Sequence, residues 1–84
     1  MTRDQVFALI QDHLADELDL DPGRIAEGSR FREDLGADSL HLVALVQELE
    51  DSYGVRIPDE EAARILTVGQ AVEFVLAHGV GASG

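Results

Sequence analysis

Apolar residues recur at helical spacing in three segments of this chain of 84 residues, and no segment alternates apolar with polar residues as a strand would. The middle segment begins at Ser39 and ends at Gly54, a residue type that often terminates helices. The outer two segments open with Thr2 and Thr67, each followed three residues later by a glutamine, which is the spacing of a capping box. The sequence therefore predicts an all-α fold with three longer helices.

Two weaker patterns lie between these segments. Residues 57–62 (Ile-Pro-Asp-Glu-Glu-Ala) predict a short helix, because proline is tolerated in a first turn and carboxylates there complement the helix dipole. The connection over about residues 18–37 contains Ile25, Phe31 and Leu35, and we expect these apolar residues to pin it to the core. The economical fold for these elements is a four-helix bundle, with three longer helices and one short one.

We expect one domain over residues 1–79 and a flexible C-terminal tail over residues 80–84. The chain contains no cysteine, so it has neither a disulfide framework nor a thiolate metal site, and its three histidines are not clustered as zinc ligands are; we predict no metal. The opening residues lack the layout of a signal peptide, and no apolar run approaches the length of a membrane span. We therefore predict a cytoplasmic protein, and we expect a monomer.

The chain is strongly acidic. Seventeen aspartates and glutamates oppose six arginines, which gives a formal net charge of −11. Such a surface repels nucleic acid and anionic lipid, so we predict no nucleic acid and no membrane among its partners. It favours proteins with basic patches, although acidity that only keeps a small protein soluble is the alternative. Weak divalent binding to clustered carboxylates would relieve the self-repulsion.

A serine stands at the start of the predicted middle helix, within the segment Asp-Leu-Gly-Ala-Asp-Ser-Leu over residues 34–40. If Asp38 is the N-cap, its carboxylate accepts from the first-turn amides and the Ser39 hydroxyl is left to point outward. A phosphodiester on Ser39 would lie near the positive end of the helix dipole, and the small Gly36 and Ala37 would let an enzyme approach. The alternative is that Asp38 and Ser39 form an ordinary helix cap.

Four stretches, in this order and spacing, resemble acyl carrier proteins, and in particular the free-standing carrier of bacterial fatty-acid synthesis: residues 33–40, 48–54, 57–62 and 65–68. The resemblance covers nearly the whole chain. It implies that a phosphopantetheinyl transferase attaches a 4'-phosphopantetheine arm from coenzyme A to Ser39. It also implies a carrier rather than an enzyme, which holds acyl groups as thioesters and delivers them to the enzymes of fatty-acid biosynthesis. With no cysteine in the chain, the only thiol would be that of the arm.

By the same resemblance, the middle helix is the recognition surface for acyl-transfer and chain-elongation enzymes. The matching positions are Asp38, Leu40, His41, Val43, Ala44, Gln47, Glu50 and Asp51, with Ile57 and Asp59 across the groove. Two of them, His41 and Ala44, stand where the family commonly has acidic residues, which should weaken salt bridges to a basic partner patch. A carrier for polyketide or other specialised acyl or aminoacyl synthesis is therefore an alternative, and an unmodified acidic interaction module is another.

Two further features bear on function. His41 follows Ser39 by two residues, but the pattern is not Gly-x-Ser-x-Gly and no acid is placed to orient the ring, so we predict no catalytic residue. We place His13 on the exposed side of the first helix. The aliphatic core is either an ordinary one or loose enough to shelter an acyl chain, and the resemblance favours the second.

Overall fold

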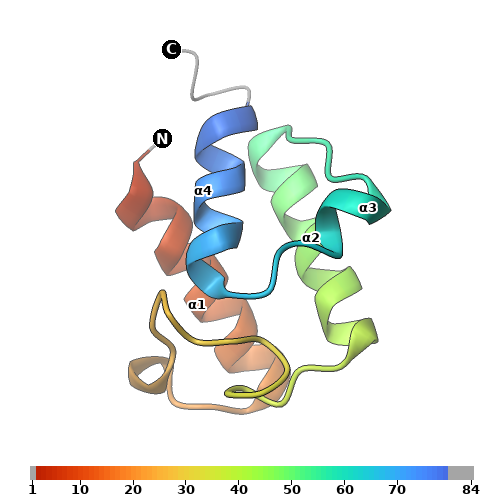
Figure 1. Cartoon of the computed structure of the whole chain (residues 1–84). Coiled ribbons are helices and arrows are strands. Elements are labelled where there is room, and N and C mark those ends of the chain that lie inside the picture. The colour runs from red at the N-terminus through yellow and green to blue at the C-terminus, as the bar shows by residue number, and fades with distance from the viewer. Residues whose placement is uncertain (1, 80–84) are drawn as a thin grey trace.

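The structure, a computed structural model that describes residues 2–79, is a bundle of helices (Figure 1). Its elements are α1 (Arg3–Leu18), the 3₁₀ helix η1 (Pro22–Arg24), α2 (Ser39–Tyr53), α3 (Asp59–Ala62) and α4 (Val68–His78). Over residues 2–79 no strand forms, and one isolated antiparallel bridge joins Arg30 to Thr67. The predicted all-α bundle of three longer helices and one short one is confirmed. The expected tail over residues 80–84 lies outside the described residues.

The helices begin and end where local side chains dictate. At the start of α1 the Thr2 hydroxyl accepts from the Gln5 N–H, and the Gln5 side chain accepts from the Thr2 N–H in return. The same reciprocal pair opens α4. Gly54 ends α2 with a φ of 66°, a left-handed conformation that glycine adopts without strain. α1 ends at Leu18, and its C-cap Asp19 has a φ of 55°, which aspartate tolerates better than most residues.

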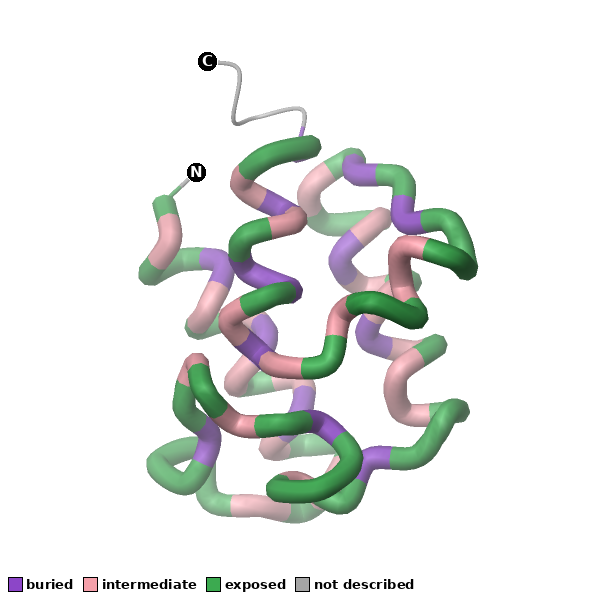
Figure 2. Tube along the Cα trace, in the orientation of Figure 1, coloured by how far each residue is buried: buried purple, intermediate pink, exposed green. Residues whose placement is uncertain are grey.

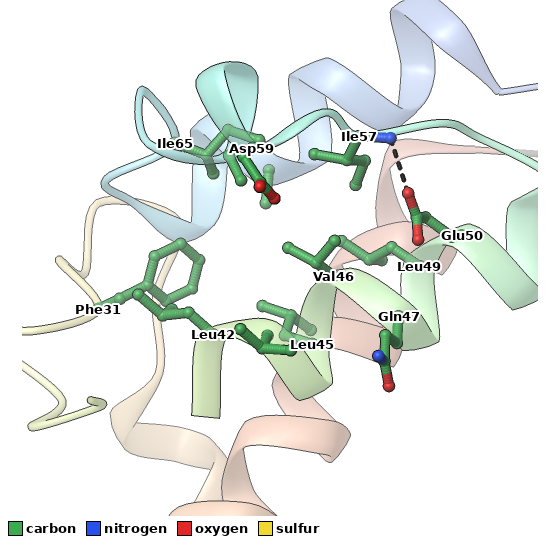
Figure 3. A pocket seen from close by; sticks show the side chains of 13 residues that line it. Phe31, Leu42, Leu45, Val46, Gln47, Leu49, Glu50, Ile57, Asp59 and Ile65 are labelled. Atoms are coloured by element: carbon green, nitrogen blue, oxygen red, sulfur yellow. Dashed lines mark hydrogen bonds between the residues drawn. The ribbon is translucent and has the colours of Figure 1, made fainter. Parts of the chain in front are cut away.

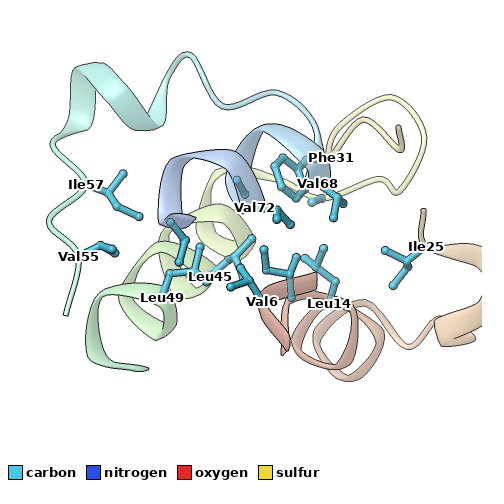
Figure 4. Packing of buried hydrophobic residues seen from close by; sticks show 14 residues of the cluster. Val6, Leu14, Ile25, Phe31, Leu45, Leu49, Val55, Ile57, Val68 and Val72 are labelled. Carbon is cyan, nitrogen blue, oxygen red and sulfur yellow. The ribbon is translucent and has the colours of Figure 1, made fainter. Parts of the chain in front are cut away.

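The core lies between the three longer helices, with α1 packed against both α2 and α4. Buried positions face inward along each helix and exposed ones face outward (Figure 2). Fully burying one such aliphatic side chain stabilises the fold by about 1.5–3 kcal/mol, and truncating it to alanine costs about 2–5 kcal/mol. The side chains that meet there include Val6, Ile10, Leu14, Leu45, Leu49, Val68, Val72 and Val75 (Figure 4).

The connection between α1 and α2 is pinned to the bundle. Ile25 and Phe31 are both buried as predicted, whereas Leu35 is only half-buried. From α1, the Gln11 side chain donates to the backbone carbonyls of Pro22 and Ile25, at 2.7 and 3.2 Å between the nitrogen and the two oxygens. This connection runs across one end of the bundle (Figure 1) and leads directly into α2.

A second set of backbone bonds ties this connection to the segment that enters α4. The Phe31 N–H donates to the Leu66 carbonyl at 3.0 Å, and the Gly69 N–H donates to the Glu27 carbonyl at 2.7 Å. A Cβ at position 69 would stand 3.0 Å from that carbonyl oxygen, so the close approach favours glycine. The backbone that precedes α2 is thus held on two sides.

Two local predictions need correction. The short helix begins at Asp59 rather than inside residues 57–58, because Pro58 is the extended N-cap and a residue before proline, here Ile57, is disfavoured in the helical region. His13 is half-buried rather than exposed, and its Nε2 is buried without a hydrogen-bond partner among residues 2–79. It borders the buried stripe of α1, next to Leu14, and a position at the edge of that stripe is partly buried.

Candidate functional site

Ser39 is the first residue of α2 and is exposed. Asp38 is the N-cap, and its Oδ1 accepts from the His41 N–H at 3.0 Å. Because Asp38 caps the helix, the Ser39 hydroxyl is not needed as a helix cap. Its Oγ instead accepts from Nη2 of Arg32 at 3.0 Å. The start of α2 therefore presents a hydroxyl to solvent beside a guanidinium.

His41 has a structural role that sequence reasoning missed. Its Nδ1 lies 3.2 Å from the Asp38 amide nitrogen and 3.1 Å from Asp38 Oδ1. A neutral ring can accept from that amide, and a protonated ring can donate to that carboxylate, so either form holds the helix start. The signal was present, because the third helical position of a capping box usually holds a side chain that accepts from the cap amide.

The Asp38 carboxylate places a negative charge at this helix start. The His41 N–H that bonds the Asp38 carboxylate holds the pKa of that carboxyl below its usual range, with smaller contributions from neighbouring groups that include Arg32. Asp38 is therefore ionised at neutral pH, directly next to the serine. Arg32, which sequence reasoning did not single out, faces this serine from the loop.

The approach to Ser39 is open. Gly36 has a φ of 72°, a left-handed conformation that turns the loop toward α2 and that a side chain would strain. A Cβ at this position would meet no atom within 4 Å, so the surface beside it is clear. Ala37 is buried, and its N–H donates to the Phe31 carbonyl at 2.8 Å. The exposed serine thus follows an ordered turn, and the surface beside Gly36 in that turn is unobstructed.

A cavity of about 320 Å³ lies between α2 and the segment that contains α3 (Figure 3). Glu50 of α2 reaches across one end, where its Oε2 accepts from the Ile57 N–H at 2.9 Å. Only three of the lining residues, Gln47, Glu50 and Asp59, have polar side chains. The apolar ones are Phe31, Leu42, Val43, Leu45, Val46, Leu49, Ile57, Ala62, Ile65 and Ala71. Because Leu42 and Val43 lie one turn from Ser39, the cavity begins close to the serine.

The ten predicted partner positions differ in accessibility. Leu40 and Val43 are 78% and 52% exposed, which is unusual for large apolar side chains. The exposed polar positions are Asp38, Gln47, Asp51 and Asp59, and the half-buried ones are His41, Ala44 and Glu50. Ile57 is 5% exposed. On α2, positions 40, 43, 44, 47 and 51 share one face by helical periodicity, whereas Ile57 and the bonded Glu50 carboxylate lie beneath the surface or are engaged within the chain.

Comparisons with known proteins agree with this geometry. The family model described as "Phosphopantetheine attachment site" matches residues 8–75. The chain is 47% identical over 78 residues to the acyl carrier protein of Rubrobacter xylanophilus, covering 93% of this chain and 96% of that protein. The structure is similar to that of the acyl carrier protein from Enterococcus faecalis, with a TM-score of 0.81 and 33% identity over 94% of this chain and all of the other.

The bundle and the family match define the class of carrier proteins that bear a phosphopantetheine group. Within that class, this chain belongs to the acyl carrier protein family. Members of the family are carriers and not catalysts, and their cofactor is 4'-phosphopantetheine.

The residues at the start of α2 fit that cofactor. An exposed hydroxyl, a guanidinium within hydrogen-bond distance and the positive end of a helix dipole all suit a phosphodiester. Among residues 2–79, no three histidines or carboxylates are grouped to hold a metal ion. Within the same range, no helix is long and apolar enough to cross a membrane.

Proposed function

We propose that Ser39 carries the phosphopantetheine arm and that the chain delivers acyl groups to the enzymes of fatty-acid biosynthesis. The observation that carries this proposal is the capping of α2 by Asp38, which leaves the exposed Ser39 hydroxyl available. Ser39 Oγ bonds to the pantetheine-bearing phosphorus of coenzyme A, while the bond from that phosphorus to the oxygen of adenosine 3',5'-bisphosphate breaks. The hydroxyl proton goes to a base of the transferase. Once attached, the arm supplies the thiol on which acyl groups travel.

Intact mass spectrometry tests the attachment residue. The wild-type chain, Ser39→Ala and Ser52→Ala are each incubated with coenzyme A and a broad-specificity phosphopantetheinyl transferase. Ser52, which is exposed on α2 at its far end, is the matched control. We expect one arm on the wild type and on Ser52→Ala, and none on Ser39→Ala. A gain on Ser39→Ala would move the site elsewhere. No gain on any chain, with the transferase active on another carrier, would contradict the proposal and leave Ser39 as an unmodified surface serine beside the Asp38 cap.

The proposal places the carrier in fatty-acid synthesis, as a cytoplasmic monomer with partners that carry basic patches. The support is the net charge of −11 and the similarity to proteins named acyl carrier proteins. Loading of malonyl groups from coenzyme A by a fatty-acid-type transacylase is the expected result. Failure to accept malonyl, with ready loading of an aminoacyl group, would favour an aminoacyl carrier; malonyl loading argues against that role but not against a polyketide carrier.

We propose that the cavity between α2 and α3 shelters the acyl chain. Its volume of about 320 Å³, its apolar lining and its position one turn from Ser39 support this use. In NMR spectra of the acylated chain compared with the unacylated holo chain, we expect shifts at cavity residues such as Val46, Leu49 and Ile65. Changes confined to the neighbours of Ser39 would contradict sequestration.

The partner surface that we propose is the exposed face of α2, with Asp59 of α3 across the groove. Leu40 and Val43 offer apolar contact there, and Asp38, Asp51 and Asp59 offer charge. Ile57 and Glu50 contribute to it by supporting the α2–α3 groove from within, since the one is buried and the carboxylate of the other bonds the backbone.

A further inference from the structure

Arg32 is placed to act on whatever is attached to Ser39. Its Nη2 donates to Ser39 Oγ at 3.0 Å, seven residues along the chain. Among residues 2–79 it forms no ion pair within 4.0 Å, whereas Arg30, two residues earlier, pairs with both Glu33 and Asp34. A guanidinium has five N–H donors, so donors of Arg32 remain for a second acceptor beside the serine.

The backbone that carries Arg32 is fixed. The preceding Phe31 is 2% exposed; its N–H donates to the Leu66 carbonyl and its carbonyl accepts from the Ala37 N–H. The Arg32 carbonyl itself accepts from the Gly36 N–H at 3.2 Å. Because this turn is already ordered, contact by the guanidinium restricts only its own side chain.

The negative charges around Ser39 would repel an attached phosphodiester, and the Arg32 guanidinium can offset that repulsion. A phosphodiester on Ser39 would add one negative charge beside Asp38, whose carboxyl has a lowered pKa and is ionised, on a chain with a net charge of −11. Like charges at such separations repel, and this repulsion would push the phosphodiester away from the protein. Arg32 is the cation whose side chain already bonds the attachment oxygen.

We propose that Arg32 is a positioning residue that holds the phosphodiester of the arm against the start of α2. This inference rests on the proposed attachment to Ser39. In the unmodified chain the guanidinium bonds the serine hydroxyl, and in the loaded chain it bonds the phosphodiester oxygens, an acceptor group whose geometry its planar donors match. The first atoms of the arm are then oriented along the protein instead of pivoting freely about Ser39.

Phosphorus-31 NMR of the loaded chain tests this inference directly. The variants are Arg32→Gln, which removes the charge, Arg32→Lys, which keeps the charge but not the planar fork, and Arg56→Gln as the matched control. Arg56 is an exposed arginine beyond the other end of α2, and a helix of 15 residues spans about 22 Å. Intact mass first establishes that each chain carries one arm, and the amide spectrum establishes that each is folded.

We expect the folded wild type and Arg56→Gln to share a phosphodiester shift that differs from the shift of the urea-unfolded holo chain. Arg32→Gln should move to the unfolded value, and Arg32→Lys should lie between. A wild-type shift in folded Arg32→Gln overturns the inference and leaves the attachment to Ser39 intact. An equal movement in Arg56→Gln also overturns it, because net charge alone would then be responsible. A wild-type chain that gains no arm overturns both proposals together.

Discussion

A serine at the start of a helix often caps the helix itself, because its hydroxyl oxygen accepts from the first-turn amides. In this chain Asp38 is the cap, and its partner in the capping box is His41. Two residues thus hold the helix start while Ser39 between them bears no such role. Modification of Ser39 can proceed without the loss of a helix cap, which suits a residue that carries a covalent group.

Removing the Asp38 carboxylate should lower the free energy of unfolding near neutral pH, whereas Ser39→Ala should change it little. The pKa of Asp38 is lowered in the folded chain relative to an unfolded value of about 3.9. Its contribution to stability is therefore present above that pH and is lost as the pH falls through the folded value. In urea unfolding measured over a pH series, the gap between wild type and Asp38→Ala should narrow below a pH of about 4. A gap that stays constant would contradict this.

His41→Asp should strengthen binding to a fatty-acid synthase enzyme with a basic patch. The new carboxylate can still accept from the Asp38 N–H, so the helix start is kept while one charge is added beside Ser39. Exposed ion pairs contribute little, so we expect a gain of roughly two- to fivefold at low salt and none at about 1 M salt. Calorimetric titration measures it, with His41→Asn as the uncharged control of similar shape. Equal affinities of the two variants at low salt would contradict it.

A hydrogen bond joins α2 to the connection that precedes α3. Glu50 accepts from the Ile57 N–H at one end of the cavity (Figure 3). A buried or half-buried N–H without a partner is costly, so this carboxylate fixes the distance between the two walls of the cavity. The groove that the proposed cargo and partners use depends on this one side chain.

Glu50→Ala should therefore speed hydrogen exchange at the Ile57 amide, by about five- to tenfold, because a net stabilisation of about 1 kcal/mol is lost locally. Glu50→Gln keeps an acceptor and should change exchange much less. Glu48→Ala is the matched control, since Glu48 accepts from the Ser52 hydroxyl on the same helix. NMR exchange rates at each amide make the comparison. Unchanged exchange at Ile57 in Glu50→Ala would show that the bond does not hold the connection.

The elements themselves could be predicted because their ends depend on near neighbours in sequence. Thr2 and Thr67 act on residues three positions away, and Gly54 needs only its own backbone freedom. The contacts that complete the site could not be predicted from near neighbours in sequence. Arg32 reaches Ser39 only after the turn at Gly36 has formed, and helical periodicity contains no information about such a turn.

His13 shows that burial, too, could not be predicted from the sequence alone. From the sequence we placed His13 on the exposed side of α1, but it is half-buried, because the burial of a residue that flanks the apolar stripe depends on what packs beside it. Glu50 is similar: the family resemblance placed it with the partner residues, while in the fold its carboxylate accepts from the Ile57 amide. Sequence patterns thus show which element a residue belongs to, whereas the packing of the elements determines which side chains are buried and which partners they bond.

The whole molecule measures 33 × 25 × 19 Å along its principal axes and carries a net charge of −11. The distance over which salt screens charges is about 30 Å at 0.01 M ionic strength and about 8 Å at 0.15 M. At low salt, carboxylates on opposite sides therefore still repel, and this repulsion destabilises the compact state. Dilute buffer should be the condition in which the fold is weakest.

Raising the ionic strength should therefore raise the thermal midpoint from its value in dilute buffer, by roughly 5 °C if about 1 kcal/mol of repulsion is relieved. We predict that magnesium acts mainly through ionic strength and that the weak divalent binding considered from the sequence adds little to it. About 10 mM magnesium chloride and about 30 mM sodium chloride have the same ionic strength, so they should give similar midpoints in calorimetry. A much larger rise with magnesium would point to bound ions, and no rise with either salt would mean that repulsion does not limit this fold.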